Sequence, residues 1–407
     1  MPPAAQPDLP LSPHGEIDSM LSRKFGKEVA NYFSGSPLNR VAFLRTDHTF
    51  LTQALHHPST TFILFKDLNP LLKDPATLAT VPYSTVKPLV GENPYLTPEA
   101  EQIAAYNSST YIPTLIFLGL DPAPPSPLTY KSHSGAPVFA LDVTPRAHLT
   151  DASNNLISSL TSQSLSFSTG RHNLTLPPSA AALYASARHL LDWNTRNPFC
   201  AQCGSPTLST NAGWKRTCPP SDTAFQTPRP SCVSRGAISN ICFPRTDPTV
   251  IMAVISASGD KILLGRQNRW PAHWYSTLAG FLEPAESVEE AVRREVWEES
   301  GVRVGRVVVH STQPWPYPAN LMIGAVGQAL PDGEAVDLGN DPELEDARWF
   351  ELAEVREALR VGTSGLGEEA GPGYKEGGLR LPPRTAIAHQ LLDAVVNGGF
   401  LAGVVKI

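Results

Sequence analysis

Residues 280–302 read GFLEPAESVEEAVRREVWEESGV. Ser287 and Glu290 form a Ser-x-x-Glu capping box, which predicts a helix that begins directly after Ser287. Gly301 can end this helix with a left-handed cap, because glycine adopts a positive φ without a steric penalty. Valines recur at positions 288, 292 and 296, so that the helix has an apolar face that we expect to pack on a core.

The same helix carries carboxylates at positions where they are costly. Glu295, Glu298 and Glu299 lie on or beside the valine stripe and near the C-terminal end, where the helix dipole disfavours anions. Glu295 and Glu299 are also like charges four residues apart, which repel. A divalent cation would remove most of this cost, and carboxylates are hard ligands that suit Mg²⁺ or Mn²⁺. The pattern predicts a metal site, with an acidic solvated helix face as the alternative.

The spacing of Gly280, Glu286 and Arg294 ahead of these glutamates resembles the Nudix box, the motif of enzymes that hydrolyse nucleoside diphosphates linked to another group. The resemblance implies an α/β/α sandwich and metal-assisted hydrolysis, in which a metal-bound water attacks phosphorus. It implies that Arg294 pairs with Glu286, and leaves the general base and the number of metal ions open. The implied catalytic residues are Glu286, Arg294, Glu295, Glu298 and Glu299. The implied metal ligands are the carbonyl of Ala279 and the carboxylates of Glu295, Glu298, Glu299 and Glu343, the last of which has Glu345 and Asp346 as alternatives.

All five cysteines lie within residues 200–242, which suits an intracellular metal site better than a disulfide framework. The first two form a C-x-x-C knuckle, followed by a glycine that eases the turn. The second pair is separated by a Pro/Ser/Thr-rich insertion, residues 219–231. Four thiolates around zinc would make a closed, structural site, with unconnected structural cysteines as the alternative. The expected zinc ligands are Cys200, Cys203, Cys218 and Cys232, with Cys242 as the rival for the fourth position.

Residues 313–318 read QPWPYP, and residues 243–248 read FPRTDP. Both segments resemble the NADH pyrophosphatase subfamily of Nudix hydrolases, in which phenylalanine stands in place of Tyr317. Residues 21–26 and the order of the domains resemble it more loosely. Three prolines would hold Trp315 and Tyr317 rigidly, so that flat bases can stack on them; a connector without a ligand is the alternative. The implied substrate contacts are Phe243, Gln313, Pro314, Trp315, Pro316, Tyr317, Pro318 and, through its backbone, Ala388.

The subfamily resemblance implies hydrolysis of NADH, and less readily of NAD⁺, to AMP and the nicotinamide mononucleotide half. Removal of NAD caps from RNA 5′ ends is an alternative with the same chemistry, although the net charge of −6 argues mildly against an RNA substrate. A catalytically inactive module that binds through its zinc ribbon is an alternative of another class. The resemblance also implies a homodimer.

The strand and helix patterns predict an α+β / α/β protein, and the resemblance implies a Nudix α/β/α sandwich preceded by a zinc ribbon and an N-terminal α+β domain. We place the N-terminal domain at 1–195, the zinc ribbon at 196–246 and the Nudix domain at 247–407. Alternating and apolar runs predict the following strands: 40–45, 60–65, 114–119, 138–142, 250–255, 261–265, 303–310, 321–328 and 347–350. Helices are expected at 179–193, 351–359 and 385–396, and a glycine-rich loop at 362–378.

The 407 residues are 41% hydrophobic and 17% charged, as in soluble globular proteins of two or three domains. No apolar run approaches the roughly 20 residues of a membrane helix. The N-terminus lacks the basic-then-apolar pattern of a secretory signal. Residues 405–407, Val-Lys-Ile, half resemble a peroxisomal Ser-Lys-Leu signal. We therefore expect a cytoplasmic protein, with the peroxisome as the second location.

Overall fold

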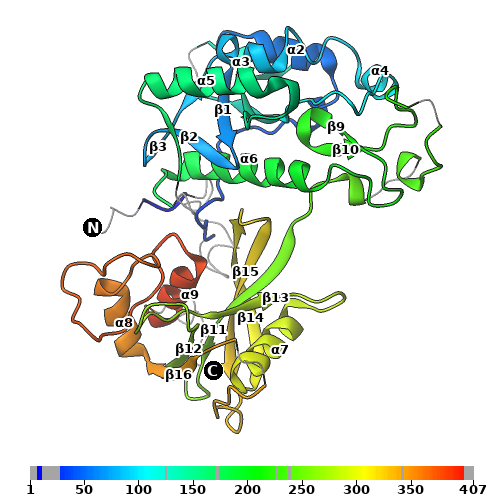
Figure 1. Ribbon diagram of the computed structural model, residues 1–407. Helices are drawn as coiled ribbons and strands as arrows, with labels where there is room; N and C mark the ends of the chain where they lie inside the picture. Colours follow the sequence, from blue (N-terminus) through cyan, green and yellow to red (C-terminus); the bar gives the residue numbers. More distant parts are fainter. Residues whose placement is uncertain are drawn as a thin grey trace. The chain divides into compact units, whose positions relative to one another are not determined.

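The computed structural model describes residues 7–11, 28–123, 126–169, 174–225, 228–236, 240–340 and 343–397. Its contacts divide the chain into two units, each described here by itself (Figure 1). The C-terminal unit comprises Met1–Gly35, Thr246–Trp315 and Asn320–Ile407. The N-terminal unit comprises Ser36–Arg245 and Pro316–Ala319. The sequence predictions for 21–26 and 405–407 lie outside the described residues.

A mixed sheet forms the centre of the C-terminal unit. Its order is β14-β15-β11-β12-β16, and β13 pairs with β11. β11 and β15 run parallel, whereas every other pair is antiparallel. The strand bounds are β11 Asp247–Ile255, β12 Lys261–Arg266, β13 Leu278–Phe281, β14 Val304–Trp315, β15 Asn320–Ala329 and β16 Asp346–Glu351. The predicted strands from residue 250 onward are all present, and β14 extends five residues beyond the predicted end at 310.

Helices cover both faces of this sheet because β11 is apolar on both sides. Val250, Met252 and Val254 point to one face and pack with α7 (Val288–Ser300). The alternate residues Ile251, Ala253 and Ile255 point to the other face, where α8 (Leu352–Val361) and α9 (Ile387–Val396) pack. Side chains alternate along a strand, so a run of apolar residues needs cover on both sides. This is the expected α/β/α sandwich, and it places α7 beside β13.

The N-terminal unit contains a second mixed sheet, of order β3-β2-β1-β7-β5, in which β4 pairs with β1, β6 with β7 and β8 with β2. One face packs on α2, α3 and α5 in a core rich in phenylalanine. On the other face Phe65 stacks on Tyr184 of α6. The strand bounds are β1 Thr61–Lys66, β2 Asn69–Asp74, β3 Thr77–Leu78, β4 Thr80–Val81, β5 Leu115–Asp121, β6 Leu128–Tyr130, β7 His133–Asp142 and β8 Ser166–Phe167. The helices are α2 His48–His56, α3 Tyr83–Val90, α4 Glu99–Ala104, α5 Thr150–Ser162 and α6 Pro178–Arg196.

One predicted strand in this unit is wrong. Residues 40–45 form a 3₁₀ turn, η1 (Ala42–Leu44), and not a strand. Val41 has a positive φ of 35° and its carbonyl accepts a hydrogen bond from Leu44, so the chain turns where the apolar run suggested extension. Apolar composition alone does not separate a buried turn from a buried strand.

The two sheets share one topology, which the sequence does not reveal. In each, a central strand (β1 or β11) runs parallel to one neighbour (β7 or β15) and antiparallel to two others. The helix of the N-terminal unit that corresponds to α7 is α3, with the sequence YSTVKPLV. It contains no carboxylate and has a proline inside. α3 therefore has no counterpart of the glutamate cluster of α7, which is formed by Glu295, Glu298 and Glu299.

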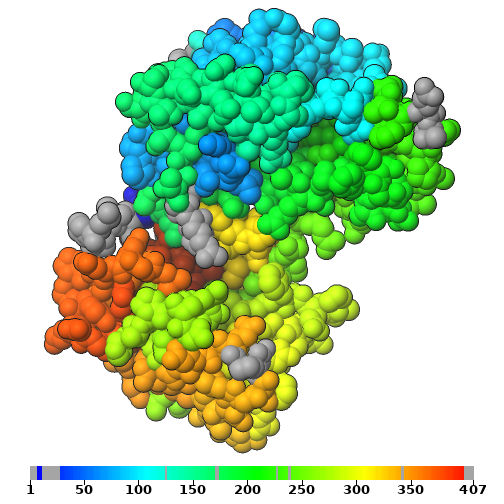
Figure 2. Space-filling view, in the orientation of Figure 1, coloured from blue at the N-terminus to red at the C-terminus, as the bar shows by residue number. Residues whose placement is uncertain are grey.

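A small cysteine-bearing module completes the N-terminal unit. A two-stranded sheet of β9 (Leu208–Thr210) and β10 (Lys215–Thr217) is followed by the turns η4 (Val233–Arg235) and η5 (Asn240–Cys242). Figure 2 shows residues near 200–220, in green, at the surface of this unit. No helix among the described residues is long and apolar enough to cross a membrane.

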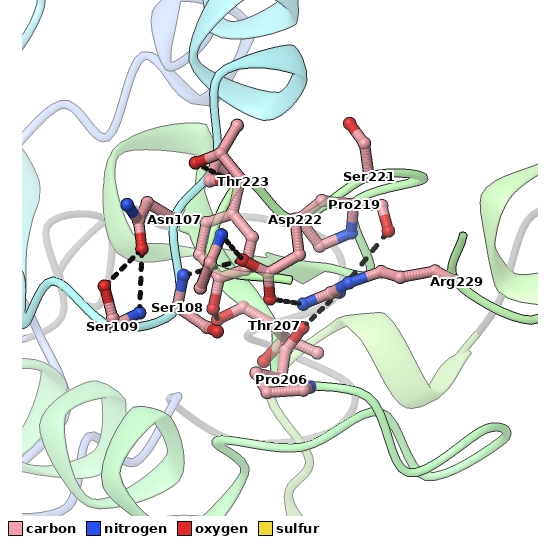
Figure 3. Close-up of polar contacts among 12 residues, drawn as sticks. Asn107, Ser108, Ser109, Pro206, Thr207, Pro219, Ser221, Asp222, Thr223 and Arg229 are labelled. Carbon is pink, nitrogen blue, oxygen red and sulfur yellow. Dashed lines mark hydrogen bonds and ion pairs between the residues drawn. The ribbon is translucent and has the colours of Figure 1, made fainter. Parts of the chain in front are cut away.

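The insertion between Cys218 and Cys232 is anchored by a buried ion pair (Figure 3). The Arg229 guanidinium lies 2.5 Å from the Asp222 carboxylate, and the two side chains are 6% and 1% exposed. Asp222 also accepts hydrogen bonds from the backbone of Ser108 and Ala224. Although burial alone would raise it, these hydrogen bonds hold the pKa of Asp222 well below its usual range. The insertion is therefore attached to residues 106–109 of the preceding domain.

Candidate active site and zinc site

The helix α7 begins and ends as its sequence predicts. The Ser287 hydroxyl accepts a hydrogen bond from the Glu290 amide, and the Glu290 carboxylate accepts one from the Ser287 amide. Gly301 ends the helix with φ 72°. Val292 and Val296 are fully buried. The helix is thus fixed at both ends and along one face.

Arg294 connects the acidic residues of the box. Its Nε and Nη2 donate to the two oxygens of Glu286 at 2.6 and 2.8 Å. Its Nη1 donates to Glu295 at 2.8 Å and to Glu298 at 2.9 Å. Its Nη2 also donates to the carbonyl of Phe281 at 2.8 Å. The expected Arg294–Glu286 pair is present, and it ties α7 to the loop after β13.

These contacts set the charges at the site. The hydrogen bonds from Arg294 lower the pKa of Glu286 to about 2, so that this carboxylate is ionised at any physiological pH. The same pairing, to Glu286 above all, raises the pKa of Arg294. Glu295 behaves differently: burial raises its pKa, the charges of Glu298 and Glu343 raise it further, and Arg294 opposes them. The ionised form of Glu295 is therefore costly in these surroundings.

Glu295 lies against a strand that has no side chain at the point of contact. A Cβ added to Gly280 of β13 would lie 1.9 Å from the carboxylate carbon of Glu295. Glycine is therefore required at 280 for space, not for backbone conformation. Ala279, the predicted carbonyl ligand, is the neighbouring residue on β13. Glu299 is only 5% exposed on the same helix.

The residues present fit a divalent cation. Glu295, Glu298 and Glu299 supply hard oxygen donors from one helix, and burial, with the charges of Glu298 and Glu343, raises the pKa of Glu295. Arg294 now lies between Glu295 and Glu298, so part of the negative charge is already balanced. Within the described residues, the cysteine group is the only set of three or more potential ligands whose atoms converge to within 4.8 Å. The glutamates must therefore adjust their side chains to hold an ion.

Glu343 is the best supported of the three acidic candidates beyond the box. Glu345 pairs with Arg266 at 2.9 Å, and Asp346 accepts a hydrogen bond from the hydroxyl of Tyr275. Glu343 is exposed, forms no ion pair with any described residue, and acts on Glu295 through its charge. Glu343 therefore remains the predicted metal ligand beyond the box.

Gln313, a predicted substrate contact, is buried and bonded to backbone groups. It is 1% exposed, and its amide nitrogen donates to the carbonyls of Tyr32 and Thr385 at 3.0 and 2.8 Å. Its amide oxygen accepts from the backbone of Ile387 at 2.9 Å. Because the whole amide is engaged by backbone groups, Gln313 positions the start of α9, which carries the predicted contact Ala388. Ala388 itself is 3% exposed.

The rest of the QPWPYP segment is divided between the two units. Pro314 and Trp315 end β14 in the C-terminal unit, where the Trp315 ring meets Phe33 edge to face at 5.8 Å. Pro316, Tyr317 and Pro318 belong to the N-terminal unit. There the Tyr317 hydroxyl lies 3.1 Å from that of Tyr184, and Arg188 lies 4.7 Å from the Tyr317 ring centroid.

Phe243, the remaining predicted contact, is 40% exposed in the N-terminal unit. The Lys215 ammonium lies 5.5 Å from the centroid of its ring. The ring is thus available to a ligand on at least part of its surface.

Four of the five cysteines converge as zinc requires. The sulfur atoms of Cys200, Cys203, Cys218 and Cys232 lie within 4.8 Å of one another. The Cys200–Cys232 and Cys203–Cys218 distances are 3.7 and 3.6 Å. Tetrahedral zinc with Zn–S bonds of about 2.3 Å separates its sulfurs by about 3.8 Å, so this group fits the ion. Cys242 is buried outside the group, which favours Cys232 as the fourth ligand.

The thiols differ in their electrostatic surroundings. Although burial opposes it, hydrogen bonds from Ser205 and from the neighbouring cysteines lower the pKa of Cys203 to about 6. Burial raises the pKa of Cys218 to about 12, against a hydrogen bond from Arg235. That arginine donates to the Cys218 sulfur at 3.4 Å and to its carbonyl at 3.2 Å. Arg235 is a zinc-site residue that the sequence reasoning missed, although it follows Cys232 by three positions.

Comparison with known proteins identifies the parts of this architecture. Residues 245–366 match the NUDIX domain, 59–193 the NADH pyrophosphatase-like rudimentary NUDIX domain, and 195–225 the NADH pyrophosphatase zinc ribbon domain. The NAD-capped RNA hydrolase of Schizosaccharomyces pombe is 35% identical over 367 residues, which are 90% of this chain and 92% of that protein. The chain belongs to the NADH pyrophosphatase subfamily of the Nudix hydrolases.

Other relatives of this Nudix hydrolase carry related names. The human NAD-capped RNA hydrolase NUDT12 is 36% identical over 395 residues, covering 90% of this chain and 73% of that protein. The mouse mitochondrial NAD(P)H pyrophosphatase NUDT13 is 38% identical over 220 residues, covering 53% and 55% of the two chains. The matched rudimentary domain agrees with the repeated sheet topology and with the absence of carboxylates from α3.

Proposed function

We propose that this Nudix hydrolase splits the pyrophosphate bond of NADH, and less readily of NAD⁺, to AMP and the nicotinamide mononucleotide half, with Mg²⁺ or Mn²⁺ as its catalytic metal. The observation that carries the proposal is the glutamate cluster of α7, with Glu295 set against Gly280, in a chain with the domain order of NADH pyrophosphatases. Relatives named as acting on NAD(P)H support the substrate.

The chain's own residues have separate tasks in this reaction. Glu295, Glu298, Glu299 and Glu343 would hold the divalent ion, which when bound neutralises pyrophosphate charge and acidifies water. Arg294 holds Glu286, Glu295 and Glu298 in one arrangement, and Gln313 fixes the start of α9. A zinc ion held by the four cysteine sulfurs would have no open position, so its role would be structural.

Removal of NAD caps from RNA is the second candidate, because the S. pombe and human relatives are named for that activity. The bond that breaks is the same, so the site described above serves both substrates. The rival proposal of an inactive binding module lacks support, since the complete glutamate set is present and the chain is a Nudix hydrolase. We also propose a homodimer, from the resemblance alone, and a cytoplasmic location with the peroxisome second, from the sequence patterns.

The test is to incubate the purified chain with NADH and Mg²⁺ and to separate the products. We expect AMP and reduced nicotinamide mononucleotide in equal amounts, with excess EDTA abolishing turnover. Glu299→Gln should lose activity, whereas Glu289→Gln, in the first turn of the same helix and outside the cluster, should not. Adenosine and phosphate as products, or full turnover in EDTA, would contradict the proposal. A parallel assay with NAD-capped RNA decides which substrate is preferred.

A further inference from the structure

A cavity of about 220 Å³ in the N-terminal unit takes no part in the site described above. It lies between α2, α4 and β9, and Figure 1 shows α4 and β9 on the same side of this unit. Leu51, Val90 and Ile112 contribute an apolar wall, while Arg45 and Ser209 contribute polar groups. A cavity with an apolar body and a few polar groups has the general form of a small-molecule site.

Arg45 brings to this cavity a positive charge that forms no ion pair with any described carboxylate. Its guanidinium carbon lies 3.6 Å from the centroid of the Trp214 ring, and that of Arg40 lies 5.7 Å from the same centroid. Among the described residues neither arginine has a carboxylate within 4 Å. Burial and the charge of Arg40 lower the pKa of Arg45 to about 10, so it remains protonated at neutral pH. Two guanidinium groups near one ring repel each other, and a bound anion would offset this repulsion.

Two polar atoms of residues that line the cavity have no hydrogen-bond partner in the part of the chain that the structure describes. They are Nε of Arg45 and Oγ of Ser209, and both are shielded from solvent. Buried polar groups are nearly always satisfied, so such atoms indicate a missing partner. Glu99 also lines the cavity, but its carboxylate accepts from the backbone of Asn211 at 2.5 Å and does not reach Arg45.

We propose that this cavity binds a small ligand that joins a phosphate to a flat apolar body, as a nucleoside monophosphate does. With one face of its guanidinium against Trp214, Arg45 offers its N–H edge to a phosphate, as arginine does in proteins. Ser209 adds a hydroxyl donor, and the wall of Leu51, Val90 and Ile112 receives the base. The volume falls below the roughly 300–1,000 Å³ of drug-sized sites, which favours a mononucleotide over a dinucleotide.

The test is calorimetric titration of the full chain with AMP, without added Mg²⁺ or Mn²⁺ so that the α7 site is not loaded. Arg45→Gln is the test variant, and Arg146→Gln, which removes the same charge from the adjoining cavity that shares Ile112 and Ser209, is its matched control. We expect one AMP per chain for the wild type and for Arg146→Gln. Arg45→Gln should bind roughly tenfold or more weakly, the loss of a charge-assisted hydrogen bond.

Further arms separate the parts of the ligand and the two sites of the chain. Inorganic phosphate and adenosine should each bind more weakly than AMP, because each lacks one half of the contacts. AMP bound at the α7 site instead would be unaffected by Arg45→Gln, so this variant also separates the two sites. Ser209→Ala should also weaken binding, and it serves if Arg45→Gln fails to fold. The proposal is overturned if AMP does not bind, if Arg45→Gln and Ser209→Ala bind it unchanged, or if phosphate alone binds as tightly.

Discussion

Replacement of Gly280 by alanine tests the arrangement of Glu295 with the smallest possible change. Gly280 has no positive φ, so the backbone accepts alanine. The added Cβ would lie 1.9 Å from the carboxylate carbon of Glu295 and 2.1 and 2.2 Å from its oxygens. Ordinary contacts of a Cβ begin at 3.4 Å. The carboxylate must therefore move by about 1.5 Å, the difference between the two distances.

The expected effect on catalysis is large and the effect on stability small. A displacement of about 1 Å in a catalytic group can cost on the order of 10²-fold in rate, or about 2.7 kcal/mol of transition-state stabilisation. The displaced atoms are the flexible end of a side chain, so the fold can adapt at a cost of about 1 kcal/mol in rotamer strain and a weakened, partly exposed ion pair with Arg294. Alanine at 280 should thus lower kcat/KM for NADH roughly 10²-fold in a folded protein.

The assay is NADH hydrolysis over a range of Mg²⁺ or Mn²⁺ concentrations, with thermal unfolding measured on the same samples. Gly371→Ala is the control, because a Cβ there meets only the carbonyl of Val361 at 3.6 Å and no positive φ is involved. If Glu295 holds the metal, a higher metal concentration should recover part of the activity of Gly280→Ala. Activity within about twofold of the wild type would refute the reasoning, as would a loss that follows unfolding.

Three further changes test other parts of the structure. Asp222→Asn should destabilise the N-terminal unit by about 3–5 kcal/mol at pH 7, because it leaves the buried Arg229 unpaired. Since the pKa of Asp222 in the folded protein lies below its ordinary 3.8, this loss of stability should persist above pH 3.8 and shrink as the pH falls through the folded pKa. Chemical denaturation of both proteins at several pH values measures the difference. Cys232→Ser should release zinc, whereas Cys242→Ser should retain it, as metal analysis of the purified variants will show. Gln313→Ala should destabilise the C-terminal unit by about 1–3 kcal/mol, because it leaves buried backbone groups without partners, and an unchanged unfolding transition would contradict its positioning role.

The sequence by itself determined the features that depend on neighbouring residues. The capping box of Ser287 and Glu290 and the cap at Gly301 follow from contacts within a few positions, so reading the residues was enough to place α7. The apolar runs predicted most strands of the C-terminal sheet, because side chains alternate along a strand whatever its partners. The C-x-x-C knuckle at Cys200 and Cys203 is likewise a feature of neighbouring residues.

Only the tertiary structure decided which distant residues meet. The choice of Cys232 over Cys242, the approach of Gly280 to Glu295 and the bonds from Gln313 to Tyr32 all join positions whose separation depends on the whole fold. The repeat of one sheet topology in the N-terminal unit was hidden because pairing, not residue identity, defines it. The end of a helix depends on residues within one helical turn, so the local sequence is enough to predict it. Packing across the sheets depends on many weak contacts between residues far apart in the sequence, and no short segment contains both partners.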